Sequence, residues 1–167
     1  MEIYRVTKDS PNWQKIGYNY VRIDAFCFGQ NIPLETEFGH DAPEDELNAI
    51  LIVDNHKPIA GLRIAYPKPG VGKIERVCVI REKQKSGVGS VMIQAAEKWI
   101  AEHGISHIVI SSQDRTAGFY QKNGYVLNEE VSPEEYEAHP RPHREPSEAP
   151  DFKPDFVCVL VEKYLKE

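Results

Sequence analysis

The chain has 167 residues, 41% hydrophobic and 28% charged, a composition that fits one globular domain and argues against disorder, collagen and coiled coil. Its 26 acidic and 20 basic residues give a net charge of −6, so it lacks the broad basic field that attracts nucleic acids and anionic membranes. No apolar run approaches the roughly 18 residues of a membrane span, and the polar first residues are unlike a signal peptide. We therefore expect a cytoplasmic enzyme or binding domain.

The three cysteines, Cys27, Cys78 and Cys158, are widely spaced and have apolar or aromatic neighbours. This pattern predicts three buried thiols that behave as small hydrophobic residues. A catalytic Cys78 is the alternative, although the sequence places no base beside it. His139 and His143 are four residues apart, but the two prolines between them prevent the helix that would put both on one face. Because no third ligand stands at a usual spacing, we expect no metal site.

The first part of the chain predicts a strand, a helix and a long loop. Residues 3–6 alternate as a short strand. Apolar residues then recur at steps of three and four until about Gly29, which predicts a helix. Its apolar face would carry Trp13, Ile16, Tyr20, Ile23 and Phe26/Cys27. The stretch 30–47 is rich in prolines, glycines and carboxylates and is predicted to be a loop.

The rest of the chain predicts more strands than helices. Three strands come first, at 49–53, 59–66 and 73–80, with turns at 54–58 and 67–72. An amphipathic helix at 87–103 is followed by a strand, a short helix and two strands, at 105–111, 114–122, 125–127 and 156–161. The proline-rich stretch 132–154 reads as an insertion, either a lid or a surface excursion. The order β-α-β-β-β-α-β-α-β-β predicts a mixed α/β (α+β) fold.

Two glycines spaced by one residue, Gly87 and Gly89, open the long helix directly after a strand and a short loop. Unpaired N–H groups and the helix dipole at such an end attract an anion, typically a phosphate. The segment lacks the Gly-Lys-Ser/Thr of a Walker loop and a full Gly-x-Gly-x-x-Gly, and the antiparallel-looking strands argue against a dinucleotide-binding βαβ unit. The alternative is a glycine-containing helix start that binds no ligand.

These residues resemble a known family. Gln84-Lys85-Ser86-Gly87-Val88-Gly89 fits the Gln/Arg-x-x-Gly-x-Gly/Ala signature of the GCN5-related N-acetyltransferases (GNAT), and residues 117–125 resemble that family's last conserved stretch. A finer resemblance, to the ElaA-like branch, rests on residues 21–26 with Gln30, Pro33, Glu35, Glu37 and Asp41. The chain departs from that branch at Gly29 and at the insertion. The resemblance implies a single GNAT-like domain over 1–167, with a central, mostly antiparallel, twisted sheet flanked by helices.

The same resemblance implies acetyl-CoA as co-substrate and assigns residues to it. The strand backbone around Val77 would pair with the pantetheine arm, and the glycine loop would hold the pyrophosphate. The implied cofactor-binding residues are Val77, Cys78, Val79, Gln84, Lys85, Ser86, Gly87, Val88, Gly89, Ser90 and Gln113, the last at a position where the family often has Asn.

Tyr120 matches the tyrosine that protonates the leaving thiolate in this family. A phenol, with a pKa of about 10, can share a proton with a thiolate whose conjugate acid has a pKa of about 8.5. The alternative is an ordinary core aromatic residue.

The nucleophile must be a neutral amine, and Glu75 is the most plausible protein base, with Glu35, Glu37 and Asp41 as loop candidates. The acidic loop suggests a cationic primary amine on a small molecule or peptide, unless it only supplies solubility. We expect direct acetyl transfer in a ternary complex; the alternatives are a non-catalytic CoA-binding sensor or interaction module, and a hydrolase or thiol enzyme that uses Cys78. Analogy with the family suggests a homodimer, and the acidic net charge predicts no nucleic-acid or membrane partner.

Overall fold

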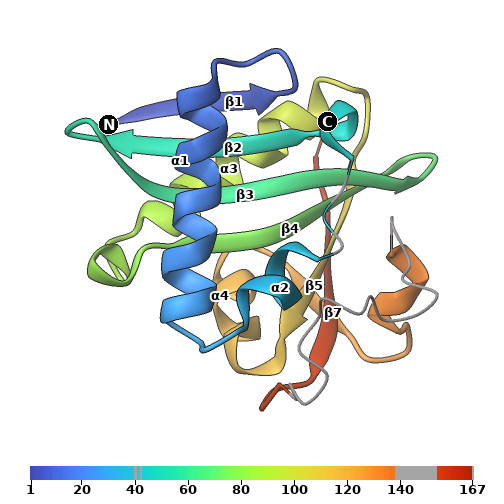
Figure 1. Cartoon of the computed structure of the whole chain (residues 1–167). Helices are drawn as coiled ribbons and strands as arrows, with labels where there is room; N and C mark the ends of the chain where they lie inside the picture. The colour runs from blue at the N-terminus through green and yellow to red at the C-terminus, as the bar shows by residue number, and fades with distance from the viewer. Residues whose placement is uncertain (40, 42, 138–153, 167) are drawn as a thin grey trace.

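The computed structural model describes residues 1–39, 41, 43–137 and 154–166, and within them one sheet joins the two ends of the chain (Figure 1). Its seven strands lie in the order β1-β2-β3-β4-β5-β7-β6. Every neighbouring pair is antiparallel except β4 and β5, which are parallel. The expected mixed α/β fold with a mostly antiparallel sheet is therefore confirmed. The strands are β1 (Glu2–Thr7), β2 (Asn48–Asp54), β3 (Lys57–Lys68), β4 (Val71–Val79), β5 (His107–Gln113), β6 (Val126–Asn128) and β7 (Cys158–Tyr164).

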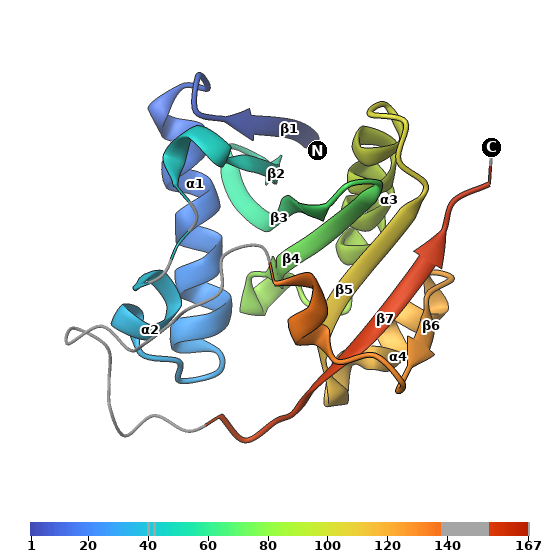
Figure 2. The ribbon, with the colours of Figure 1, turned by 90° about the vertical axis from the view of Figure 1, so that its right-hand side faces the viewer.

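Helices cover both faces of this sheet (Figures 1 and 2). The first two, α1 (Asn12–Arg22) and α2 (Leu34–Phe38), lie on one face, and α3 (Val88–Ala101) and α4 (Ala117–Lys122) lie on the other. The central strands β2 and β3 are nearly continuous runs of buried residues, as expected for strands packed on both sides. Short 3-10 helices complete the described part of the chain: Glu44–Glu46, Arg81–Lys83, Asp114–Thr116 and Pro133–Tyr136.

Three predicted segments differ in detail from the structure. The first helix does not run uniformly to Gly29, because α1 gives way to a π-helix at Ile23–Phe28, although the helical path does end at Gly29. The stretch 30–47 is not one loop, since it contains α2 and the 3-10 helix Glu44–Glu46, each started by a proline. The turn predicted at 67–72 is shorter, because β3 continues to Lys68 and β4 begins at Val71.

The predicted apolar face of the first helix was wrong over α1, although Phe26, in the π-helix that follows, is buried as predicted. Trp13 is 52% exposed and Ile16 66% exposed, and the helix instead buries the side that carries Gly17, Tyr18 and Arg22. Glycines make this close packing possible. A Cβ on Gly17 would lie 3.2 Å from the Leu51 side chain, so a larger residue there would require Leu51 or the helix to shift by a few tenths of an ångström.

The predicted burial of three thiols holds for one cysteine only. Cys78 is buried in β4, Cys27 is half-buried and Cys158 is exposed. Most of the predicted insertion, with His139 and His143, lies outside the described residues. No helix of the described part of the chain is long and apolar enough to cross a membrane.

Candidate functional site

The two parallel strands separate after a short stretch of pairing. β4 pairs with β5 only from Val71 with His107 to Ile74 with Ile110. Past Ile74, β4 stays on β3, and past Ile110, β5 stays on β7 through the pair of Gln113 with Cys158. The second half of β4 therefore has no strand beside it on the β5 side within the described chain, and its backbone can pair with an extended ligand.

The backbone groups that face this gap belong to two residues that the sequence singled out, Val77 and Val79. The Ile80 N–H donates to Ile59 O of β3 at 2.9 Å, so residues 78 and 80 face β3. Successive residues of a strand point their polar backbone groups to opposite sides, so those of Val77 and Val79 face the gap. The Gln84 side chain agrees with this direction, since its Nε2 donates to Val79 O at 3.2 Å.

The N-terminus of α3 lies next to this gap. Gly87 is the N-cap residue, its φ is +87° and no side chain caps the helix end. The first N–H groups of the helix therefore have no side-chain acceptor, which suits an anion such as a diphosphate. Gly89 serves packing instead: a Cβ there would lie 3.0 Å from the ring of Phe119 on α4. Phe119 is thus a packing residue that joins α4 to the start of α3.

Gln113, implied as a cofactor contact, has a different set of partners here. Its Nε2 donates to Gln30 Oε1 at 2.9 Å, and its Oε1 accepts from Arg115 Nε at 2.8 Å. Arg115 Nη2 also donates to Gln30 Oε1, at 3.1 Å. These bonds tie the chain after the π-helix to the end of β5. In the sequence, Gln30 was noted only for the resemblance to the ElaA-like branch. No local pattern predicted its hydrogen bonds to Gln113 and Arg115.

Tyr120 extends from α4 into the core and is 7% exposed. Its ring packs edge-on against Phe119, with 5.1 Å between centroids. Burial, and next the neighbouring Cys78 thiol, raise the pKa of the Tyr120 phenol, which keeps it protonated. No described residue is a hydrogen-bond partner of its hydroxyl. The phenol can therefore donate a proton to a bound ligand without breaking a bond to the described chain.

Cys78 is unsuited to nucleophilic catalysis. Its thiol donates to Gly61 O at 3.4 Å, and burial raises its pKa well above the ordinary value. A thiol in apolar surroundings stays protonated and unreactive. The thiol-enzyme alternative has no support from the geometry.

A buried network of ion pairs lies on the α1–α2 face of the sheet, next to β3 and β4. Arg22 is fully buried, and its Nε donates to Glu37 Oε2 at 3.0 Å while its Nη1 donates to Asp41 Oδ2 at 2.8 Å. Arg63 of β3 pairs with Asp41 and, at 3.2 Å, with Glu75 of β4. One continuous set of charges therefore joins α1, α2 and the two strands.

Glu75, the candidate base, lies inside this network. Besides Arg63, it pairs with Lys73 Nζ at 3.1 Å. Burial alone would raise the pKa of the Glu75 carboxyl, but Arg63, Lys73 and Arg76 outweigh burial and lower it. A carboxylate held in this way accepts a proton poorly at neutral pH.

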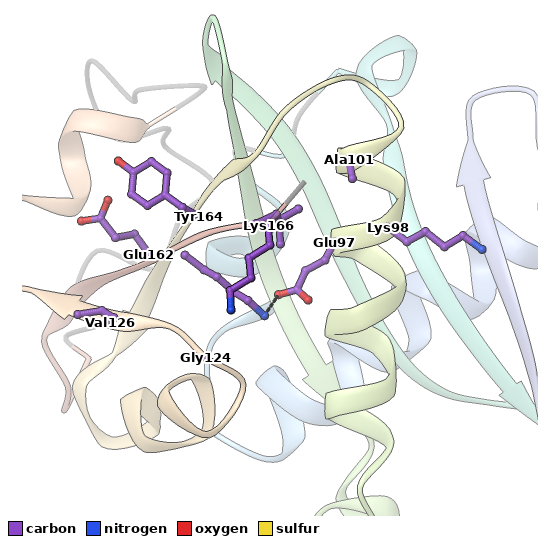
Figure 3. Close-up of a pocket in the computed structure, with 10 residues that line it drawn as sticks. Glu97, Lys98, Ala101, Gly124, Val126, Glu162, Tyr164 and Lys166 are labelled. Atoms are coloured by element: carbon purple, nitrogen blue, oxygen red, sulfur yellow. Dashed lines mark hydrogen bonds and ion pairs between the residues drawn. The ribbon is translucent and has the colours of Figure 1, made fainter.

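An open pocket of the described surface lies elsewhere (Figure 3). It has a volume of about 900 Å³ and is open to solvent, between the C-terminal half of α3 and the ends of β6 and β7. The Lys163–Glu97 ion pair, at 3.0 Å, crosses it. It contains none of the predicted site residues and lies at the other end of α3 from Gly87.

Comparison with known proteins agrees with this geometry. The model of the acetyltransferase (GNAT) family matches residues 16–125, which is more than half of the chain. The chain belongs to the GNAT family. The "Uncharacterized N-acetyltransferase YjcF" of Bacillus subtilis is 39% identical over 111 residues, which cover 66% of this chain and 77% of that relative. The protein is therefore an acetyltransferase.

Solved GNAT structures share the fold at low sequence identity. Escherichia coli ElaA superimposes with a TM-score of 0.72 at 19% identity and covers 98% of this chain and 99% of its own. The catalytic domain of the Tetrahymena GCN5 histone acetyltransferase, in complex with coenzyme A, gives a TM-score of 0.65 at 14% identity, and the match covers 99% of this chain and 93% of that one. At these identities the likeness shows the fold, and the ElaA-like branch stays a prediction.

The ion network generates a stability prediction. Replacing Arg22 with Met should lower the free energy of unfolding by about 3–5 kcal/mol, because it leaves the buried Glu37 carboxylate without its main partner. Urea unfolding followed by tryptophan fluorescence measures this loss. The double variant Arg22→Met/Glu37→Met should lose less than Arg22→Met alone.

Arg5→Gln is the matched control, because Arg5 pairs with Glu102 on the solvent-exposed surface. It should leave the free energy of unfolding nearly unchanged. Equal losses in Arg22→Met and Arg5→Gln would show that the buried network does not hold the helices on the sheet.

Proposed function

We propose that this GNAT enzyme transfers the acetyl group of acetyl-CoA directly to a primary amine in a ternary complex. The observation that carries the proposal is the gap between β4 and β5, into which the backbones of Val77 and Val79 point, beside the uncapped α3 N-terminus at Gly87. An extended arm can pair with the strand while its diphosphate lies at the helix end. The coenzyme A complex of Tetrahymena GCN5, which shares the fold, supports the same cofactor here.

In this proposal the chain supplies position and a proton. The strand and the helix start hold the thioester beside the amine, and such positioning accounts for most of the rate gain in a two-substrate reaction. Tyr120, which burial keeps protonated, gives its phenolic proton to the leaving thiolate through a hydroxyl that no described residue engages. The buried, protonated Cys78 offers no nucleophile for a covalent intermediate, which favours direct transfer.

The base is assigned to no protein carboxylate. Glu75 is bound in ion pairs that lower its pKa, and Glu37 and Asp41 are paired with Arg22. We propose that the amine loses its proton to solvent before it attacks. In that case the rate follows the fraction of neutral amine as the pH rises.

The expected cationic acceptor rested on the charge of the acidic loop. Two of the carboxylates in that stretch, Glu37 and Asp41, are paired with Arg22, while Glu35 and Glu44–Glu46 are exposed. The pairing with an arginine weakens the local field that would attract a cation. Primary amines as a class stay within the proposal, without a requirement for a second positive charge.

The cofactor site is tested at Gly87. Gly87→Asp puts a carboxylate where the diphosphate would bind, and it should weaken acetyl-CoA binding by about tenfold or more in calorimetric titration, the cost of a lost charged hydrogen bond. Gly70→Asp is the matched control: Gly70 also has a positive φ, +78°, with open space around it, but lies in the β3–β4 turn. No binding by the folded wild type, or equal loss in both variants, would contradict the proposed site.

The proton donor is tested at Tyr120. Tyr120→Phe should lower kcat by about a hundredfold to ten-thousandfold in a thiol-release assay with a panel of primary amines, because the general acid is lost. Acetyl-CoA binding by calorimetry should stay unchanged. A non-catalytic CoA-binding module would instead release no thiol in the wild type.

Tyr125→Phe is the control, since it removes a hydroxyl that donates to Glu97 at 2.8 Å, away from the gap. It should retain kcat. If Tyr120→Phe is as active as Tyr125→Phe, Tyr120 is not the general acid, while the proposed transferase function still stands.

A further inference from the structure

The ion network contains three arginines. Two of them donate hydrogen bonds to carboxylates from more than one guanidinium nitrogen. Arg22 donates from Nε, Nη1 and Nη2, and Arg63 donates from Nε to Glu75 and from Nη1 to Asp41. Their guanidinium groups hold the elements together. The third arginine, Arg76, differs from both.

The side chain of Arg76 makes no hydrogen bond with any described residue. Its Nε lies 3.3 Å from Glu37 Oε2, close enough for an ion pair but without the geometry of a hydrogen bond. Glu37 Oε2 already accepts from Arg22 Nε and Nη2. The side chain of Arg76 is 37% exposed, so its outer nitrogens are available to a ligand.

The charges of the network do not balance. Its described members are four cations and three carboxylates, which leaves one positive charge in excess: Arg22, Arg63, Lys73 and Arg76 against Glu37, Asp41 and Glu75. Arg76 carries this excess, because it is the network arginine without a hydrogen bond. A half-buried guanidinium of this kind attracts an anion with a planar, two-oxygen face, such as a carboxylate.

The backbone fixes Arg76 at the site. The register between β3 and β4 shifts between Gly61/Cys78 and Arg63/Glu75, so β4 has a bulge there, and Arg76 has a φ of +53°. A positive φ at a residue other than glycine costs energy, and bulges re-aim side chains. Arg76 directly precedes Val77, whose backbone faces the gap, and its side chain reaches Glu37 of α2.

We propose that Arg76 binds a carboxylate of the acceptor, so that the acceptor is an amine that also carries a carboxylate, as amino acids do. The inference rests on the proposed function and specifies its acceptor. The guanidinium would hold the carboxylate beside the strand that places the thioester, which brings the amine of the same small molecule near the carbonyl carbon.

The test compares acceptors that differ only in the carboxylate. Alanine, methionine, phenylalanine and glutamine are each paired with their α-carboxamides, with acetyl-CoA as donor. For at least one amino acid, kcat/KM should be about tenfold or more above that of its amide. A ratio of this size is what the free energy of one charged hydrogen bond produces. In calorimetry with the coenzyme A-saturated protein, the same acid should bind more tightly than its amide.

Arg76→Gly removes the side chain and suits the positive φ, so the bulge should be kept. In this variant the preference for the acid should disappear in both turnover and binding, while acetyl-CoA binding persists. Arg76→Lys keeps the charge without the planar fork and should retain only part of the preference. Arg5→Gln, an exposed arginine far from the gap, should retain all of it.

Each other outcome overturns the inference. Acetyl-CoA binding with no acid preference, or a preference that survives in a folded Arg76→Gly, would remove the role of Arg76 and leave the proposed function standing. A preference for succinyl-CoA over butyryl-CoA that Arg76→Gly abolishes would place the carboxylate on the acyl group instead. No acetyl-CoA binding by the wild type would overturn the proposed function and this inference with it.

Discussion

The separation of β4 from β5 after Ile74 is the feature on which the rest of the site depends. A sheet ordinarily satisfies the backbone groups of its inner strands, so an unpaired stretch between two strands is costly unless a ligand or water fills it. Here the stretch contains Val77 and Val79 and leads into the glycine start of α3. Strand, gap and helix end thus form one continuous surface for an extended ligand with an anionic end.

The strands on either side of the gap must be held in place, and on the α1–α2 face of the sheet buried ion pairs do this. Arg22 of α1, Glu37 of α2, Arg63 of β3 and Glu75 of β4 are joined by ion pairs, so helices and strands are held in register by directional contacts. Asp41 bridges the two arginines. Breaking one partner would leave an uncompensated charge in the core, which makes the network cooperative. On the other face, Phe119 packed over Gly89 fixes α4, and with it Tyr120, against the start of α3.

Sequence analysis could predict features that local pattern encodes. The strands, the helix after Gly87 and the likeness of residues 84–89 to a family signature all rest on short-range periodicity or spacing. The buried face of α1 could not be predicted in this way, because it depends on glycines that let Tyr18 and Arg22 approach the sheet. The partners of Arg22 lie 15 and 19 residues away in a stretch that looked like a loop, and no local pattern links them.

The bulge at Arg76 did leave a mark in the sequence. Ile74 and Val77 are both apolar but three residues apart, so the alternation of β4 shifts by one residue between them, which is typical of an inserted residue. The shift places two charged residues, Glu75 and Arg76, in the middle of an apolar strand. The Glu75 side chain points to its ion-pair partners in the network. The outer part of the Arg76 side chain is left exposed. The backbone distortion where the gap begins thus also orients the one network guanidinium that is not hydrogen-bonded within the described chain.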